Sequence, residues 1–265
     1  MAFQVKSARL STGLTLPYVE QGSATGIRVV LVHAYVDSWR SFERVLPHLP
    51  QSIHAFAVTQ RGHGDADKPA SGYGVTKLSA ELAAFMDAVR LDTALIVGSS
   101  SGGYVAQRFA LDYPGRALGI VLIGTPRSLR DKPGIVDTVS ELQDPVDPTF
   151  VRQFVEATTS QSVPPEFLQS MIVESCKVPA YVWKAALQGL VDAVPPTETG
   201  TIIAPTLILW GDRDDFLPRT DQQSLAAAIP GSTLVVYEGA GHVVHWEEPE
   251  RVAADVVSFA ESIAS

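Results

Sequence analysis

Residues 94–111 constrain the fold more than any other part of this 265-residue chain. They open with a short apolar run, residues 94–97, of the kind found in strands buried in a parallel sheet. A Gly-Ser-Ser-Ser-Gly-Gly run at 98–103 follows at once, and apolar residues then recur at helical spacing up to Pro114. A strand that enters a helix through Gly-x-Ser-x-Gly predicts a sharp turn that exposes its central serine.

Ser100 is the one serine of this run with glycine two positions before and two positions after it, at Gly98 and Gly102. We therefore predict that Ser100 is a nucleophile on a strained turn. The backbone N–H of Ser101 then lies at a helix N-terminus, where negative charge is stabilised. The alternative is a Ser/Gly-rich loop that only caps the helix, and the strand and helix on either side favour the first interpretation.

Strands and helices alternate at short intervals along most of the chain, which predicts an α/β fold: a mostly parallel twisted sheet with helices on both faces. A β-ribbon is expected over residues 5–20. The expected strands are 28–32, 53–58, 94–97, 118–123, 205–210 and 233–237. Besides the helix after Ser100, helices are expected from about Ser38 to before Pro50, and at 76–89, 220–229 and 249–263.

Residues 126–203 show a different pattern. Prolines separate short amphipathic pieces at 150–157, 167–173 and 181–191, and no run resembles a strand. We expect a helical cap inserted between strands 6 and 7, with residues 1–125 and 204–265 forming the core domain.

Composition narrows the classes of partner. The formal net charge of −9 argues against nucleic acid and anionic membranes, which need basic patches. No apolar run approaches the ~18 residues of a membrane span, and the first residues lack the pattern of a signal peptide. Cys176 is the only cysteine, which excludes an intrachain disulfide and fits a cytoplasmic location. Without a neighbouring histidine motif, Cys176 is interpreted as a buried or idle thiol.

Two further strand ends carry the groups that a serine nucleophile needs, which are a base and a group that orients the base. The apolar run 207–210 is followed by Gly-Asp-Arg-Asp-Asp at 211–215. The run 235–237 is followed, one residue later, by Gly-Ala-Gly-His at 239–242. The chain order of serine, aspartate and histidine is the one used in sheets of this type.

Together with Glu-Glu-Pro at 247–249, these motifs resemble the α/β-hydrolase fold superfamily, in its serine-nucleophile branch with a helical lid. The resemblance covers essentially the whole chain except the lid. It implies that Ser100 attacks, His242 shuttles the proton and Asp214 holds the imidazole tautomer. Asp212 and Asp215 are alternatives to Asp214 that we interpret as turn or solvent carboxylates.

The resemblance also implies an oxyanion hole made by the N–H groups of Ser101 and Tyr35. The family usually has His-Gly before the second donor, whereas this chain has His33-Ala34. The Ala34 methyl group restricts a backbone that can require unusual dihedral angles. For the Tyr35 side chain three roles stay open: it could narrow the pocket, donate from its phenol, or pack.

Other histidines and a metal site are weaker hypotheses. His245 could compete as the base, but we expect it at the pocket rim or packed at a helix start. His63 is expected in a structural turn. A zinc site of His242, His245 and Glu247 is conceivable but lacks a ligand pattern elsewhere, so no metal and no cofactor are expected.

The expected function is a cofactor-free serine hydrolase that cleaves a carboxylic ester or lactone through an acyl-enzyme. The alternatives are a carbon–carbon bond hydrolase, a perhydrolase, a cofactor-independent ring-cleaving dioxygenase, and a ligand receptor with residual hydrolase activity. We expect a small, apolar substrate, and nothing in the sequence indicates an oligomeric state. The candidate pocket residues are Tyr35, Phe150, Phe154, Trp183 and Val243.

Overall fold

A single mixed sheet forms the centre of the computed structural model, which describes residues 3–130 and 133–264. Its strands, in the described residues, are β1 (Val5–Arg9), β2 (Thr15–Gln21), β3 (Ile27–Val32), β4 (Ile53–Val58), β5 (Ala94–Ser99), β6 (Ala117–Ile123), β7 (Thr206–Gly211) and β8 (Thr233–Tyr237). The spatial order is β1-β2-β4-β3-β5-β6-β7-β8. The β1–β2 and β2–β4 pairs are antiparallel, and every pair from β4 to β8 is parallel. The α/β prediction is confirmed.

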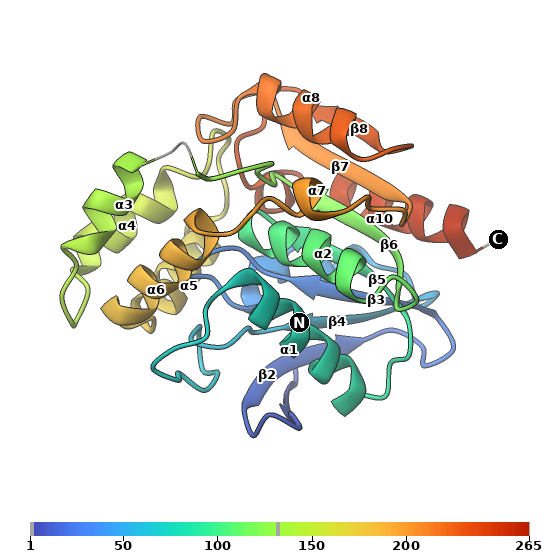
Figure 1. Cartoon of the computed structure of the whole chain (residues 1–265), viewed down its shortest axis with the longest axis horizontal. Coiled ribbons are helices and arrows are strands. Elements are labelled where there is room, and N and C mark those ends of the chain that lie inside the picture. Colours follow the sequence, from blue (N-terminus) through green and yellow to red (C-terminus); the bar gives the residue numbers. More distant parts are fainter. Residues whose placement is uncertain (1–2, 131–132, 265) are drawn as a thin grey trace.

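Helices cover both faces of this sheet (Figure 1). One apolar cluster joins the sheet to α1 (Val75–Ala88), α2 (Ser101–Asp112) and α8 (Arg219–Ala228). A second cluster joins the other face to α10 (Pro249–Ala264). Neighbouring residues of a strand point to opposite faces, so Val30 of β3 belongs to the first cluster and Leu31 to the second. Two-sided burial explains why the parallel strands are continuous apolar runs rather than alternating ones.

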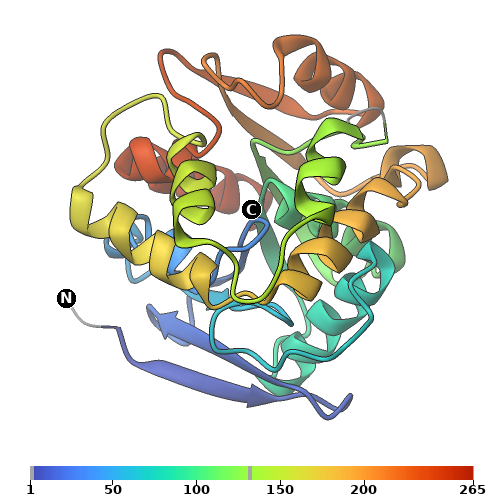
Figure 2. The same ribbon diagram turned by 90° about the vertical axis from the view of Figure 1, so that its left-hand side faces the viewer.

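Five helices of the described chain lie between β6 and β7 in the sequence. They are α3 (Pro133–Ser140), α4 (Pro148–Glu156), α5 (Pro165–Cys176), α6 (Ala180–Val191) and α7 (Pro196–Thr199), and we call them the insert helices. Figure 1 shows α3 to α6 gathered at one end of the sheet, and in Figure 2 they lie in front of it.

The insert helices pack on loops that leave the carboxyl ends of the parallel strands. Val36, after β3, and Trp246, after β8, share an apolar cluster with Met171 of α5 and Trp183 of α6. The division into a core and a cap at 126–203 stays a prediction. No helix in the described ranges combines the length and apolar character that a membrane span requires.

The helix expected from Ser38 to before Pro50 is wrong. The segment instead forms two 3₁₀ turns, η1 (Trp39–Phe42) and η2 (Leu46–His48), joined by i→i+3 hydrogen bonds. Pro47 has no N–H to donate to the carbonyl of Glu43, which an α-helix over this segment would require. The apolar side chains of Trp39 and Phe42 are nevertheless buried, so the face was predicted and the helix type was not.

Candidate active site

Ser100 lies on a strained turn between β5 and α2. Its φ of 48° and ψ of −114° are rare for a residue with a side chain. The flanking glycines are required by close backbone approach, since a Cβ on Gly98 would lie 2.4 Å from the Gly102 carbonyl oxygen. A Cβ on Gly102 would lie 2.3 Å from the carbonyl oxygen of Val32 in β3. The turn therefore packs against the end of the neighbouring strand and presents the serine hydroxyl there.

A continuous hydrogen-bonded chain runs from this hydroxyl to a buried carboxylate. His242 Nε2 lies 3.0 Å from Ser100 Oγ, and His242 Nδ1 lies 2.8 Å from Asp214 Oδ2. The other oxygen of Asp214 accepts hydrogen bonds from the N–H groups of Phe216 and Leu217, at 2.8 and 2.9 Å. With a proton on Nδ1, the imidazole can donate to the carboxylate, and in that tautomer Nε2 can accept the proton of the serine hydroxyl.

The structure brings Asp214, rather than its acidic neighbours, to His242. Asp212 is exposed and accepts a hydrogen bond from the N–H of Gly239 at 2.6 Å. Asp215 is also exposed. The turn after β7 thus buries Asp214 and leaves Asp212 and Asp215 exposed.

Glu247 connects the loop that carries His242 to the segment between α4 and α5. Its carboxylate accepts hydrogen bonds from the N–H groups of Gly241, Ser160 and Gln161, at 2.6, 2.6 and 3.0 Å. The N–H of His242 itself donates to the Thr158 carbonyl at 3.1 Å. Residues 158–161, just after α4, therefore help to hold the imidazole in place.

Ser101 and Tyr35, two residues that line the same cavity as Ser100, have backbone N–H groups without an acceptor in the described residues. Ser101 is the first residue of α2, so its N–H has no acceptor within the helix. Neither it nor the N–H of Tyr35 meets a hydrogen-bond acceptor in the part of the chain that the structure describes. The Tyr35 phenol is occupied, because it donates to the Trp183 carbonyl at 2.6 Å. Of the three roles left open for this side chain, an extra phenolic donor toward Ser100 does not fit that bond.

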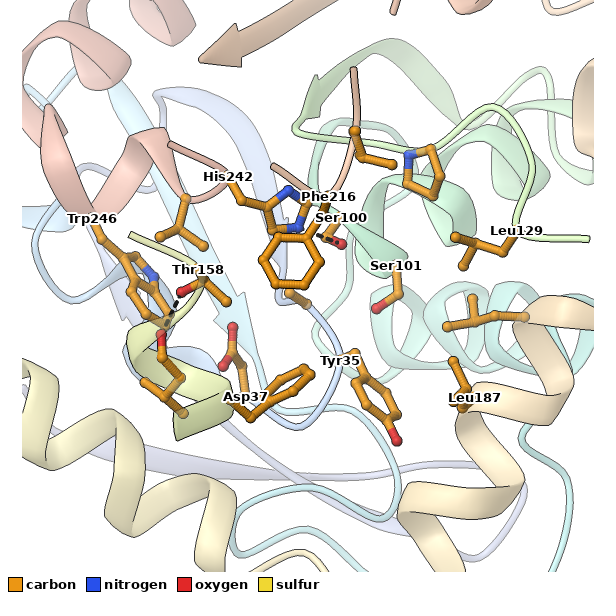
Figure 3. A pocket seen from close by; sticks show the side chains of 17 residues that line it. Tyr35, Asp37, Ser100, Ser101, Leu129, Thr158, Leu187, Phe216, His242 and Trp246 are labelled. Carbon is orange, nitrogen blue, oxygen red and sulfur yellow. Dashed lines mark hydrogen bonds between the residues drawn. The ribbon is translucent and has the colours of Figure 1, made fainter. Parts of the chain in front are cut away.

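A cavity of about 250 Å³ adjoins Ser100 and His242 (Figure 3). Most of its lining is apolar, and the lining comes from the segments that follow β3, β5, β6, β7 and β8 and from the insert between β6 and β7. The lining residues are Ala34, Tyr35, Asp37, Ser100, Ser101, Pro126, Leu129, Phe154, Val155, Thr158, Leu187, Leu190, Phe216, Leu217, His242, Val243 and Trp246.

Three of the candidate pocket residues, Tyr35, Phe154 and Val243, line this cavity. Phe150 and Trp183 do not, and for them the pocket interpretation is corrected. Trp183 is fully buried and packs edge-on against Tyr35 and Phe154, while Phe150 packs on Trp183. These two rings support the wall from behind.

Asp37 is a lining residue that the sequence analysis missed. Its side chain is buried in a mostly apolar wall and accepts a 3.0 Å hydrogen bond from Ser41 Oγ. Burial raises the pKa of the Asp37 carboxyl to about 7; the Ser41 hydrogen bond opposes this and the nearby Glu174 carboxylate adds to it. Position 37 lies only two residues after Tyr35, but the direction of its side chain depends on the turn between them.

The remaining histidines lie away from this hydrogen-bonded chain. His245 is fully buried and lies 3.0 Å from Ser41 Oγ through Nε2, and burial lowers its pKa to about 3. His63 is buried and bonded to the Arg61 carbonyl. His33 accepts from the N–H of Gln60 and so braces the loop after β3. Within the described residues, no three His, Cys, Asp or Glu side chains are grouped to hold a metal ion.

A sequence model of the Alpha/beta hydrolase family matches residues 29–255, which is most of the chain. The chain belongs to the α/β-hydrolase family. This α/β-hydrolase is therefore an enzyme, a hydrolase that acts on a small-molecule substrate.

Named relatives agree with that assignment. The chain is 25% identical to the AB hydrolase superfamily protein YisY of Bacillus subtilis, over 89% of this chain and 92% of that protein. The esterase RhEst1 of Rhodococcus sp. is 26% identical with a TM-score of 0.83, over 98% of this chain and 99% of the esterase. The esterase EaEST of Exiguobacterium antarcticum shares the fold, with a TM-score of 0.87 and 22% identity over 97% of this chain and all of that one.

Proposed function

We propose that this hydrolase cleaves a carboxylic ester through an acyl-enzyme, with Ser100 as nucleophile, His242 as general base and acid, and Asp214 as the group that orients the imidazole. The observation that carries the proposal is the Ser100–His242–Asp214 hydrogen-bonded chain at the edge of an apolar cavity. The similarity to an esterase at 26% identity supports an ester as the substrate class.

The proposed reaction has two balanced steps. Ser100 Oγ attacks the carbonyl carbon while His242 Nε2 takes the serine proton, and the alcohol then leaves with that proton. A water molecule attacks the acyl-serine next, His242 takes its proton and returns it to Ser100, and the carboxylic acid is released. The N–H groups of Ser101 and Tyr35 stabilise the oxyanion in both steps.

The cavity indicates the kind of acyl or alcohol chain that fits. Part of the apolar lining comes from three leucines, which are Leu187 and Leu190 of α6 and Leu129 after β6. We infer a substrate with a mainly apolar chain, over which the insert helices act as the cap. Lactones contain the same reacting group and belong to the same proposal.

Replacing the nucleophile tests this proposal. We expect Ser100→Ala to lower kcat on small esters by about 10⁴-fold or more and to abolish labelling by a fluorophosphonate. Ser99→Ala is the matched control, because Ser99 is the adjacent serine and its hydroxyl is buried and has no hydrogen-bond partner in the described residues. Full turnover in Ser100→Ala, or oxygen consumption that survives this change, would overturn the proposal.

A further inference from the structure

The cavity has one carboxyl group that the proposed chemistry does not use. Asp37 is only 5% exposed, and Figure 3 shows its carboxyl group pointing into the cavity, below Thr158 and His242 in this view. An ionisable group buried in an apolar wall costs free energy unless it finds hydrogen-bond partners. A substrate that fills the cavity can supply such partners to Asp37.

The Asp37 carboxyl has only one hydrogen-bond partner among the described residues, the Ser41 hydroxyl. The Ser41 hydroxyl accepts from Trp246 Nε1 at 3.0 Å, and it lies 3.0 Å from both Asp37 Oδ2 and His245 Nε2. Its single proton goes to Asp37, since His245 can donate from Nε2 and leave Nδ1 bare. His245 Nδ1 is in fact buried without a partner among the described residues. No described residue donates to the other oxygen, Asp37 Oδ1.

Thr158 supplies a second polar atom to the same wall. Its hydroxyl donates to the Val155 carbonyl at 2.7 Å, so the lone pairs of Oγ1 are left to accept. Apart from Ser100, Ser101, His242 and the occupied phenol of Tyr35, the other side chains of the lining carry no hydrogen-bonding group besides the buried indole of Trp246, which is paired with Ser41. Asp37 and Thr158 line the same cavity and offer it polar atoms that the proposed chemistry does not use, and we call these two side chains the polar subsite.

We propose that Asp37 and Thr158 bind a hydroxyl group of the ester substrate, at a position away from the scissile bond. A hydroxyl fits because it both donates and accepts: it accepts from the protonated Asp37 carboxyl while donating to Thr158 Oγ1, and it donates its single proton to the carboxyl when Asp37 is ionised. This inference rests on the proposed ester hydrolysis for its substrate class, and it adds a specificity determinant to it. Burial brings the pKa of Asp37 to about 7, so both forms are present near neutral pH.

The groups around Asp37 favour a neutral hydroxyl over an ammonium group. Glu174 faces the carboxyl from α5, but its charge is already paired with Lys177 at 2.8 Å and lies 3.7 Å from Arg40. His245, on the other side, has its pKa lowered to about 3 by burial and is neutral. A cation in the cavity would have the Asp37 carboxyl as its counter-ion, and this carboxyl is only partly ionised near neutral pH. Burying the cation there would therefore cost more free energy than burying a hydroxyl.

Paired esters test the subsite. The panel is ethyl hexanoate, its derivatives with a hydroxyl on carbon three, five or six, its terminal amino derivative, and butyl hexanoate with and without a terminal hydroxyl on the alcohol. Titration of released acid gives kcat/KM for each ester. For at least one hydroxylated ester, we expect Asp37→Leu to lower the ratio of its kcat/KM to that of its plain counterpart by about 10- to 100-fold. Asp37→Leu should cleave the plain ester several-fold faster than the wild type does, because the bound ester then desolvates no carboxyl group.

Asp37→Asn and Asp92→Leu are the controls. Asn keeps hydrogen-bonding capacity at position 37, so the ratio should fall less than in Asp37→Leu, and this variant also guards against a folding defect. Asp92 is exposed and outside the cavity, and its replacement by Leu should leave every ratio within about twofold. Equal ratios in wild type and Asp37→Leu for all hydroxylated esters would overturn the subsite. A fall confined to the amino ester would overturn the hydroxyl and indicate a cation site.

A binding measurement separates failure of the subsite from failure of the proposed function. In Ser100→Ala, with and without Asp37→Leu, affinity for the same esters can be followed by tryptophan fluorescence, since Trp246 lines the cavity. We expect the hydroxylated ester to bind at least about 10-fold more weakly when Asp37 is also replaced. This result does not depend on turnover. If both proteins bind the hydroxylated ester equally well, the subsite is wrong whatever the enzyme hydrolyses.

Discussion

The two sides of the cavity each hold a buried aspartate and a histidine, but they differ in how completely these groups are hydrogen-bonded. One side holds Ser100, His242 and Asp214, and we call it the triad side. There, Asp214 accepts hydrogen bonds from two backbone N–H groups and from His242, and both ring nitrogens of His242 have partners. On the Asp37 side, the carboxyl has one partner among the described residues, and His245 uses one nitrogen.

This difference separates two uses of a buried charge. The loop after β7 donates two N–H groups to one oxygen of the Asp214 carboxylate, and the other oxygen is bonded to His242. The Asp37 carboxyl lacks such support, and its pKa of about 7 reflects burial more than any partner. A fully satisfied group gives fixed geometry, whereas an incompletely satisfied one keeps hydrogen-bonding capacity for a ligand.

The same substitution on each side is the sharpest way to break this comparison, and the larger effect is expected on the triad side. Asp214→Asn should lower kcat by about 10³- to 10⁴-fold, because the amide favours the wrong imidazole tautomer. Ester hydrolysis at saturating substrate measures it. Asp212→Asn, an exposed aspartate of the same loop, is the matched control and should stay within a few-fold of wild type. A loss below about tenfold in Asp214→Asn would mean that His242 does not depend on this carboxylate.

The triad side was predictable from the sequence because backbone constraints mark it. Gly98 and Gly102 are required where a Cβ would meet main-chain atoms, and such requirements are visible in the sequence without knowledge of the packing. The loops that carry His242 and Asp214 follow the ends of two apolar strands, and the choice of Asp214 over Asp212 and Asp215 came from the resemblance to the family. Parallel strands place their carboxyl ends at one edge, so three distant loops could be expected to meet.

The Asp37 side could not be predicted because long-range packing determines it. Whether Phe154 or Trp183 faces the cavity depends on how α4 and α6 pack on Tyr35, which no local pattern encodes. The 3₁₀ turns after Ser38, where a longer helix was expected, set the direction of Ser41 and hence its bond to Asp37. The sequence thus predicts the reacting groups better than the shape of the pocket.

Asp37→Asn should give the second-largest effect, on stability rather than on rate. Because the folded-state pKa of Asp37 is raised from 3.8 to about 7, folding takes up a proton between these values, and the wild type loses stability as pH rises through this range. Asn does not titrate. The free energy of unfolding of Asp37→Asn, relative to that of the wild type, should therefore rise by about 1 to 4 kcal/mol from pH 4 to pH 8.

Urea denaturation at pH 4, 6 and 8 measures this difference. Asp92→Asn serves as the control, since the exposed Asp92 side chain should give a constant difference from wild type. The groups facing Asp37 are Ser41, Glu174 and, through Ser41, His245. A gap between Asp37→Asn and wild type that does not change with pH would show that the carboxyl is hydrated, which would remove the contrast with Asp214.

His245→Gln tests the histidine of the Asp37 side, with a smaller expected effect. The folded-state pKa of His245 is lowered from 6.5 to about 3, so its contribution to stability is present above pH 6.5 and is lost as pH falls below it. Gln places an N–H near the position of Nε2 and does not titrate. The slope of unfolding free energy against pH between 6 and 4 should therefore decrease by up to about 1.4 kcal/mol per pH unit. An unchanged slope would contradict a neutral, buried His245.

Ala34→Gly should have the smallest effect, and it tests whether the triad side has a weak point in its second oxyanion donor. The sequence comparison with the family suggested that the Ala34 methyl group restricts the loop. In the structure the left-handed residue of this turn is Val36, with φ of 59°, and Ala34 is not among the residues with positive φ. The methyl group therefore imposes no strain, and Gly at this position should change kcat by less than about threefold and lower stability by about 0.5 to 1 kcal/mol through added backbone entropy. Steady-state kinetics and urea denaturation measure both quantities. A tenfold gain in kcat would instead mean that the methyl group displaces the Tyr35 N–H from the oxyanion, and the triad side would then be less complete than its hydrogen bonds indicate.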